Sequence, residues 1–445
     1  MLNNLILNLY WFLEFFRDGY HRVFTLPWSQ FMAMFWGLMF LELPRYLIAD
    51  IYSFLDQFTY RWFRNEERNQ DQIRRKTLRN DPPPVSVIIP ALNEEDTIEA
   101  TVRSVREQSY KNLEIIVVDD GSTDHTQRVC SRMEEKQWIK YLRFEERQGK
   151  SPALNHGLQH AKHDFIVFMD SDCTLDRDAI LNAMVRFQDP TVGAVAGNLA
   201  VRNQDQNILT TLQSLEYLLS ITIGRIFRSK IGILPIVSGA FGVFDRNDIE
   251  RAGGHEPGPG NDSDLAIRIR KLGKKITFAH DSTTLTNVPT NLWSLIKQRM
   301  RWNRNIVRNR VRKHSNVFDY QSAGFIFLNF LSFCDTLFYT GILSFAWLVY
   351  IIQVLIIWPS DFPIIYSVIF MVLFVSRCVQ FSIGLYIVNY SYKMLPTASL
   401  LILYGPYKVL LRFVRIVAMV QELLYKSSYK DPFAPKKVQG EIPRF

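Results

Sequence analysis

The sequence predicts an α/β protein in which a mostly parallel sheet, covered by helices, is flanked on both sides by transmembrane helices. Two observations support this class. Long apolar stretches lie towards the two ends of the 445-residue chain. The middle alternates short apolar runs with stretches of helical period, a pattern typical of strands and helices in turn. Strand–helix alternation indicates a parallel sheet between layers of helices.

The predicted sheet domain covers residues 81–290. It begins at 85–90 with VSVIIP, a short apolar run closed by proline, as expected of a buried parallel strand. A helix is predicted at 97–108, where apolar residues recur at helical spacing, and a strand follows at 114–118. The predicted elements that come next are a helix at 124–133 and a strand at 165–169.

Acidic residues follow two of these strands. Asp119 and Asp120 come after the second, and Asp170-Ser171-Asp172 after the third. Ligands of such sheets bind beyond the carboxyl ends of the strands. Asp170 and Asp172 can therefore hold one hard divalent cation, Mg²⁺ or Mn²⁺, together with substrate phosphates. The alternative is that these side chains only form turns and cap helices.

Residues 323–425 are predicted to be a C-terminal membrane region with two or three spans. Residues 323–358 contain a single charged residue and are long enough for one span plus a shorter interfacial helix. Residues 363–390 are a second candidate and 397–425 a third.

The third candidate carries Lys408, Arg412 and Arg415 on one helical face. Basic residues within a span usually face protein or a water-filled path. The alternative is a helix that lies flat on the membrane surface, with these side chains at lipid phosphates.

Residues 1–60 are predicted to be an N-terminal membrane region with one span near 28–50. An amphipathic stretch at 2–16 precedes this span, and a second span there stays open. No cleavable signal peptide is expected, because the start lacks a basic region and a small-residue cleavage site.

Basic segments next to the membrane regions predict the orientation. The linker 61–80 has seven Lys/Arg against three acids, and 297–313 has eight and no acid. The positive-inside tendency places the sheet domain in the cytoplasm of a multi-pass protein of the cell (inner or plasma) membrane. The basic tail 426–445 fits the same side, where the lipid bilayer is the expected partner of these segments.

The composition excludes several other classes. Hydrophobic residues make up 48% of the chain, which does not fit a disordered or fibrous protein. The four cysteines form no CxxC pair, so neither a disulfide framework nor a zinc ribbon is expected. The net charge of +9 is not interleaved with base-stacking aromatics, so nucleic acid is not an expected partner.

The order of the motifs resembles a known family. VIIPALNEE, VVDDGSTDHT, GKSPALNHG, FMDSD, SGAFGVFDR, GNDSDL and QRMRW follow one another between about residues 82 and 302. This order is similar to family 2 glycosyltransferases. It is most similar to the processive, membrane-embedded branch that contains cellulose, chitin, hyaluronan and poly-N-acetylglucosamine synthases. The closing Q-x-x-R-W is the most specific element.

The resemblance implies a GT-A fold that binds a nucleotide-activated sugar. The residues expected at the nucleotide sugar are Ala91, Asn93, Glu94, Asp119, Asp120, Lys150, Asn155, Asp170 and Ser171. Asp170 and Asp172, the latter most directly, would bind the diphosphate through the metal.

The resemblance also implies which residues bind the acceptor sugar. Gly239 would let the acceptor sugar approach the backbone closely, and Asp262 is the expected general base. The family usually has an acid before this aspartate, whereas this chain has Asn261, which leaves a charged role there in doubt. The glycine- and proline-rich residues 253–260 are expected to form an irregular loop that shapes the acceptor site.

Residues 291–322 are predicted to form interfacial amphipathic helices that contain the Q-x-x-R-W motif. On a helix Gln298, Arg301 and Trp302 share one face, where an arginine suits a diphosphate and a tryptophan a sugar ring. The resemblance assigns the acceptor and diphosphate to these three and Arg299. The alternative is a basic helix at the membrane surface with a tryptophan anchor.

The function expected from the resemblance is that of a processive inverting glycosyltransferase. It would polymerise UDP-glucose or UDP-N-acetylglucosamine onto a growing polysaccharide, giving a β-linked product that passes through the membrane region. A partner subunit for export is compatible with this. Two alternatives stay open, a transferase that adds a single sugar to a polyprenyl phosphate or glycolipid, and an inactive scaffold or secretion subunit, which Asn261 would suit.

Overall fold

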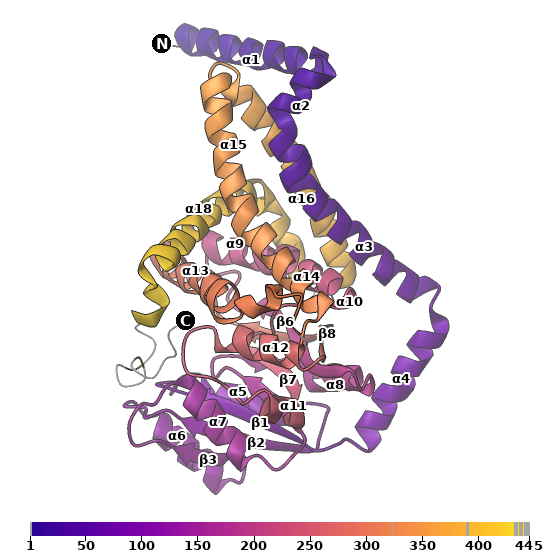
Figure 1. The fold of residues 1–445 in the computed structure, drawn as a ribbon, viewed down its shortest axis with the longest axis vertical. Coiled ribbons are helices and arrows are strands. Elements are labelled where there is room, and N and C mark those ends of the chain that lie inside the picture. The colour runs from indigo at the N-terminus through magenta and orange to yellow at the C-terminus, as the bar shows by residue number, and fades with distance from the viewer. Residues whose placement is uncertain (1, 323, 389–390, 431–434, 436–438, 440–445) are drawn as a thin grey trace.

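A mixed sheet of eight strands forms the centre of the protein (Figure 1). The computed structural model describes residues 2–322, 324–388, 391–430, 435 and 439. The strands are β1 (Val85–Ala91), β2 (Leu113–Asp119), β3 (Lys140–Arg143), β4 (Phe165–Met169), β5 (Thr174–Leu175), β6 (Val192–Val201), β7 (Phe241–Asp245) and β8 (Lys275–Thr286).

The strand order is β3-β2-β1-β4-β7-β6-β8-β5. Pairings within the first four strands are all parallel, while β7 is antiparallel to both β4 and β6. With β6·β8 parallel and β5·β8 antiparallel, four of the seven pairings are parallel. The predicted α/β class and its mostly parallel sheet are confirmed. The carboxyl ends of β1, β2 and β4 consequently lie at one edge.

Alternate residues of β1 pack into two hydrophobic cores, one on each face of the sheet. Val87 and Ile89 belong to one core, with side chains of α5, α6 and α8. Ile88 belongs to the other, with side chains of α7 and α12. The helices around the sheet are α5 (Ile98–Arg106), α6 (Thr126–Glu135), α7 (Lys150–His160), α8 (Ala179–Met184), α11 (Arg246–Arg251) and α12 (Asn261–Lys271). The predicted helices at 97–108 and 124–133 are α5 and α6.

The basic segment 61–80 forms the end of one helix and a second helix, α4 (Asn65–Asn80). Arg75 of α4 donates to Asp281 of β8 over 2.6 Å and to Asn182 of α8 over 2.6 Å. The segment is therefore bonded to the sheet domain and is not a free linker.

Within the described residues, two helices are long and apolar enough to cross a membrane, Phe327–Ile357 and Phe362–Ile387. The first consists of α14 (Phe327–Thr336), a π-helical turn and α15 (Leu343–Ile357), and the second is α16. The sequence indicated a span and a separate short helix at 323–358, whereas the described part is one helix of 31 residues. No charged residue except Asp335 interrupts it.

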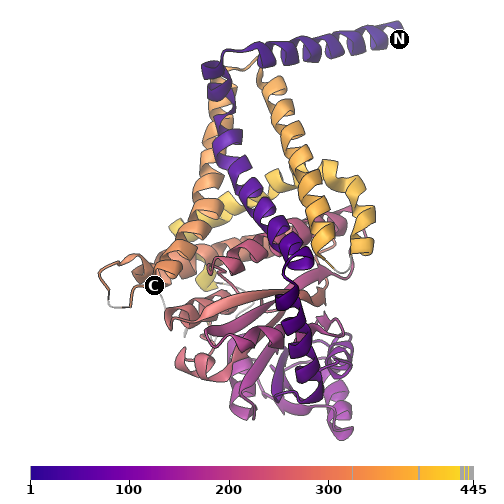
Figure 2. The same cartoon turned by 90° about the vertical axis from the view of Figure 1, so that its right-hand side faces the viewer.

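The N-terminal helices are bent. α1 (Leu2–Thr25) runs across the end of α15 and α16 that is farthest from the sheet (Figure 2). α2 (Trp28–Trp36) and α3 (Leu43–Trp62), joined by a π-helical turn, descend towards the sheet domain. Leu13–Thr25 and Trp28–Glu42 meet at 115° and are apolar enough to form a span only when counted together.

A layer of amphipathic helices lies between the long apolar helices and the sheet (Figure 1). It contains α9 (Ile208–Glu216), α10 (Ile223–Lys230), α13 (Leu292–Ile306) and α18 (Leu401–Tyr425), with the short α17 (Ser391–Met394) before α18. α18 covers most of the third predicted span, 397–425, and is not among the helices apolar enough to cross a membrane within the described residues.

The basic stripe on α18 is paired within the protein. Lys408 Nζ lies 3.9 Å from Glu216 of α9. Arg412 Nη2 lies 2.5 Å from Glu42, and Arg415 donates to Ser344 over 3.4 Å. These side chains therefore face neighbouring helices. Of the predicted tail 426–445, residues 431–434, 436–438 and 440–445 lie outside the described residues.

Candidate active site

The first two sequence motifs meet at the carboxyl ends of β1 and β2. Ala91 is paired with Asp119, and the Asp120 N–H donates to the Ala91 oxygen over 2.8 Å. The Asn93 N–H donates to Ser122 Oγ over 2.9 Å, and its own side chain accepts from the Thr123 N–H. The two predicted nucleotide segments therefore form one continuous edge.

The carboxylates of Asp119 and Asp120 are buried and already hydrogen-bonded. Asp119 accepts from the Ser122 N–H over 2.8 Å and from the Tyr141 hydroxyl over 2.7 Å. Asp120 accepts from the N–H groups of Gln148 and Gly149 at 2.7 and 2.8 Å. These two residues shape the loops around the predicted nucleotide site, and Asp120 holds the turn from which Lys150 begins α7.

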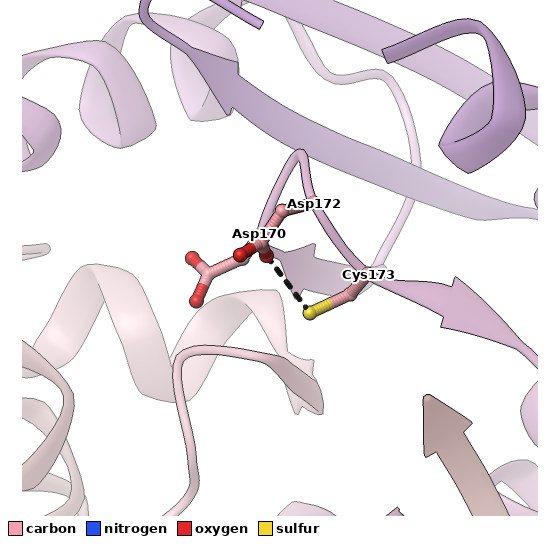
Figure 3. A group of neighbouring side chains, drawn as sticks. All are labelled: Asp170, Asp172 and Cys173. Carbon is pink, nitrogen blue, oxygen red and sulfur yellow. Dashed lines mark hydrogen bonds between the residues drawn. The ribbon is translucent and has the colours of Figure 1, made fainter. Parts of the chain in front are cut away.

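Asp170, Asp172 and Cys173 form a cluster after β4 (Figure 3). Their ligand atoms lie within 4.8 Å of one another. Burial strongly raises the pKa of the Cys173 thiol, which donates to Asp172 Oδ1 over 3.2 Å. A protonated thiol is a poor metal ligand, so the two carboxylates are the groups that fit a hard divalent cation. Ser171 lies between them, buried, with its carbonyl bonded to Thr101.

Glu94 lies near the same cluster. Burial raises its pKa, and the negative charges of Asp172 and Asp170 add to the effect. The N–H of Glu94 donates to Thr126 over 2.8 Å, and its carboxylate accepts from the Thr97 hydroxyl. Glu94 therefore connects the predicted nucleotide edge to the carboxylate cluster.

Lys150 joins the carboxylate cluster to a small, partly open cavity of about 20 Å³. Its ammonium group pairs with Asp170 and lines the cavity together with Asp262 and Gly239. A Cβ atom added to Gly239 would lie 3.1 Å from Lys150 Nζ, and 3.8 Å or more from the Asp170 oxygens. The full lining is Lys150, Leu154, Phe168, Met169, Val237, Ser238, Gly239, Phe244, His255, Asn261 and Asp262.

Asp262 lies in the first turn of α12. Its Oδ1 accepts from the Ser263 N–H over 2.7 Å. Burial raises the pKa of Asp262, while that hydrogen bond and the Lys150 charge oppose the shift. A raised pKa makes a carboxylate a better base. The preceding Asn261 stands where the family usually has an acid. Its side-chain amide donates a hydrogen bond to Ser151 Oγ over 3.1 Å.

Asp264, by contrast, binds other parts of the protein. It accepts from Arg268 over 2.9 Å and lies 2.6 Å from Lys313 Nζ and 2.8 Å from His314 Nε2. Burial alone would raise the pKa of Asp264. The His314 hydrogen bond and the charges of Arg268 and Lys313 nevertheless hold this pKa well below its usual range. Asp264 ties α12 to the helix that follows α13.

Asn155 is bonded to the loop 253–260. Its amide donates to the His255 oxygen over 2.7 Å and accepts from the His255 N–H over 2.8 Å. This residue was predicted at the nucleotide sugar, and in the structure it holds the loop 253–260. That loop contains no helix or strand, as predicted.

The Q-x-x-R-W residues are on α13. Arg299 is buried and its Nη2 donates to Glu216 over 2.8 Å, while its guanidinium lies 4.2 Å from the centre of the Trp302 ring. Trp302 is 39% exposed, and the Gln298 Oε1 is buried with no hydrogen-bond partner among the described residues. None of Gln298, Arg299, Arg301 and Trp302 lines the cavity within the described chain.

One further residue, not predicted, connects this helix to Asp262. Asn309, in the π-helical segment after α13 (Val307–Lys313), is fully buried. It donates to the Gly260 oxygen over 3.0 Å and to Ser263 Oγ over 2.7 Å. Its position on the helix, two turns after Trp302, is visible in the sequence, but its partners 46 and 49 residues away are not.

Comparison with known proteins agrees with this geometry. Residues 86–253 match the family described as Glycosyl transferase family 2. A poly-beta-1,6-N-acetyl-D-glucosamine synthase of Staphylococcus aureus (strain MSSA476) is 29% identical over 285 residues, which are 63% of this chain and 64% of that protein. The synthase of the same name from Staphylococcus epidermidis is 30% identical over 223 residues, 49% of this chain and 53% of that protein. The chain thus matches less than two thirds of the length of these relatives.

A solved structure supports the fold. The mannosyltransferase PcManGT from Pyrobaculum calidifontis, in complex with GDP-Man and Mn²⁺, matches with a TM-score of 0.54 and 22% identity, over 86% of this chain and 99% of that one. The likeness shows that the fold is GT-A-like. The motif order and the family match identify residues 86–253 as a glycosyl transferase family 2 domain.

Proposed function

We propose that the protein is a processive inverting glycosyltransferase that polymerises UDP-N-acetylglucosamine into a β-linked polysaccharide. The observation that carries the proposal is the cavity in which Asp262 lies beside Lys150, because Lys150 also pairs with Asp170 of the carboxylate cluster. A candidate base and a candidate diphosphate site are thereby adjacent. The names of the staphylococcal relatives favour N-acetylglucosamine over glucose as the donor sugar.

The donor would lie along the edge formed by Ala91, Asn93 and Asp120, with its diphosphate near Asp170 and Asp172. The two carboxylates supply the oxygen ligands that Mg²⁺ or Mn²⁺ prefers, and the Mn²⁺ of the Pyrobaculum calidifontis mannosyltransferase is consistent with such an ion. When bound, the ion neutralises charge on the leaving diphosphate. Lys150 would contribute a second positive charge at the same place.

Asp262 would accept the proton of the acceptor hydroxyl as that oxygen attacks the anomeric carbon. A positioned base typically contributes roughly 10² to 10⁴ in rate. The bond to the leaving diphosphate breaks in the same displacement, so an α-linked donor gives a β-linked product. Only one carboxylate is needed for this chemistry, unlike the two of retaining glycosidases.

We propose further that the protein is multi-pass with its sheet domain in the cytoplasm. The two long apolar helices and the basic residues of 61–80 and 297–313 support this orientation. The growing chain would leave past α13, where Trp302 offers an exposed aromatic face suited to a sugar ring. Because the α18 stripe is paired with Glu216 and Glu42, we do not assign it to the polymer.

The test is nucleotide release by the purified protein in detergent or nanodiscs. UDP-N-acetylglucosamine, UDP-glucose and GDP-mannose would each be supplied with Mg²⁺ or Mn²⁺, and Asp262→Asn would be the matched control. We expect release from UDP-N-acetylglucosamine, a product of high molecular weight, and loss of both in the variant. A product that stays in organic solvent would favour single addition to a lipid. Folded protein that releases no nucleotide would favour the inactive scaffold.

A further inference from the structure

His255 is buried, and its ring has no hydrogen-bond partner within the part of the chain that the structure describes. The residue is only 5% exposed, and neither Nδ1 nor Nε2 of its ring is hydrogen-bonded among the described residues. An unsatisfied buried polar group costs free energy, and such groups are rare enough in native proteins to need a reason. A phenylalanine would fill the same space without that cost.

The backbone around His255 is held firmly. Asn155 exchanges two hydrogen bonds with it, at 2.7 and 2.8 Å, and Arg268 donates to the Gly254 oxygen over 2.7 Å. Gly253 and Gly254 have φ angles of +84° and +68°, which favour glycine. A Cβ atom at Gly254 would also lie 2.8 Å from Asn155 Oδ1. The loop therefore fixes one ring in one place and leaves its nitrogens without partners.

The ring lies in the cavity that contains Asp262. His255, Asp262, Lys150 and Gly239 all line it, and the imidazole packs edge-on against Phe168, with centroids 4.7 Å apart. Burial, together with the charge of Lys150, lowers the pKa of His255 to about 3. The neutral ring therefore offers one N–H donor and one acceptor nitrogen at neutral pH. A sugar hydroxyl, which also donates and accepts, is matched to this pair, whereas a phosphate oxygen only accepts.

We propose that His255 is a binding residue for the acceptor sugar, whose ring hydrogen-bonds a hydroxyl neighbouring the one that Asp262 deprotonates. This assignment rests on the proposed function, because it names a contact within the same site. A sugar hydroxyl that reaches the ring would satisfy a ring nitrogen, and the packing of the ring against Phe168 would orient that contact. An ordered water could bond to the same nitrogens, and a structural ring needs no ligand, so the experiment must separate these from acceptor binding.

The experiment compares His255→Phe and His255→Gln with the wild-type protein. Phenylalanine keeps the packing against Phe168 and removes both nitrogens, while glutamine restores one donor and one acceptor. The matched control is His160→Phe, because His160 lies at the end of α7 and its ring bonds to the His156 oxygen, away from the cavity. The readouts are the melting temperature, the KM for UDP-N-acetylglucosamine, and the KM for short β-linked N-acetylglucosamine oligosaccharides.

In His255→Phe we expect the acceptor KM to rise about tenfold or more, the loss of roughly one hydrogen bond. The donor KM and the slow hydrolysis of donor without acceptor should be unchanged, and the melting temperature unchanged or higher. His255→Gln should recover part of the acceptor affinity. An unchanged acceptor KM in His255→Phe, or an equal rise in both KM values, would overturn the assignment of His255 and leave the proposed function standing. A wild-type protein that releases no nucleotide would instead overturn the proposed function, and the assignment with it.

Discussion

Asn309 donates a hydrogen bond to the Gly260 oxygen over 3.0 Å, and Gly260 is the N-cap of the helix whose first turn contains Asp262. The same amide donates to Ser263 on the other side of Asp262. The helix that carries the Q-x-x-R-W motif is therefore bonded on both sides of the candidate base, to the Gly260 backbone and to the Ser263 side chain. Changes along this helix can alter the position of Asp262 without touching it.

Asn309→Ala should test this connection. It removes three hydrogen bonds of a fully buried side chain, those to Gly260 and Ser263 and the one accepted from Arg308, which we expect to cost about 1 to 3 kcal/mol of stability. Sugar transfer should fall by about tenfold or more, since small displacements of a catalytic group are costly. Asn303→Ala is the control, because the Asn303 side chain donates to the Arg299 oxygen of its own helix and to no other group in the described part of the chain. Equal transfer rates in the two folded variants would contradict the connection.

Gly239→Ala should impair transfer with little loss of stability. The added Cβ would lie 3.1 Å from Lys150 Nζ, the flexible end of a side chain that can shift. That shift would disturb the contact of Lys150 with Asp170, and we expect transfer to fall about tenfold while the melting temperature changes little. Gly224→Ala, in α10, is the control, and it should keep full activity. Full activity in Gly239→Ala would mean that neither substrate nor Lys150 needs this space.

The motif residues Arg299 and Trp302 should behave differently when changed. Arg299→Met leaves the buried Glu216 without its 2.8 Å partner, and breaking such a pair typically costs about 3 kcal/mol or more. Trp302→Ala, at a residue 39% exposed, should leave the melting temperature nearly unchanged but shorten the polymer or stop its synthesis. The measurements are thermal unfolding in detergent and product length. If Arg299→Met were as stable as the wild type, the structural role that we assign to Arg299 would be wrong.

Asp281 should make stability depend on acid pH. Burial alone would raise its pKa, but the charges of Arg186 and Arg75 lower it to about 2, below the ordinary value of 3.8. A lowered carboxyl pKa contributes stability that is present above about pH 4 and is lost as the pH falls towards 2. Asp281→Asn should therefore cost roughly 2 kcal/mol at pH 7.

That difference should persist down to about pH 4 and shrink below it, as followed by thermal unfolding in detergent. Glu250→Gln is the control, because the ion pair of Glu250 with Arg246 joins neighbours on one helix and its carboxylate is about half exposed. Such a pair contributes little. A pH-independent difference between wild type and Asp281→Asn would contradict this origin of stability.

The strands with apolar runs and acidic ends could be predicted from the sequence, and β1, β2 and β4 were found within a residue or so of the predicted bounds. Strands β6 and β7 could not. All ten residues of β6 are buried, so it has no polar–apolar alternation, and β7 contains Gly242, which a sequence pattern reads as a turn. Gly242 is needed because a Cβ atom there would lie 2.2 Å from Val237.

The candidate site, too, could be predicted only in part from the sequence. The residue types and order at Asp170, Asp172 and Asp262 indicate chemistry without any structure. The use of Asn155 to hold the loop 253–260 depends on a partner 100 residues away, and that of Arg299 on a partner 83 residues away. Partners at such separations are brought together by the fold, and nothing local in the sequence indicates them. His255 stood within the predicted acceptor loop, but only the cavity singles it out.

The most direct measurement is the length distribution of the product at early times, with UDP-N-acetylglucosamine and a large excess of short acceptor. A processive synthase should give long chains while most of the acceptor stays unextended, and Asp262→Asn should give none. Acceptors that each gain one sugar, with no long chain at any time, would contradict the proposal that this protein is a polysaccharide synthase.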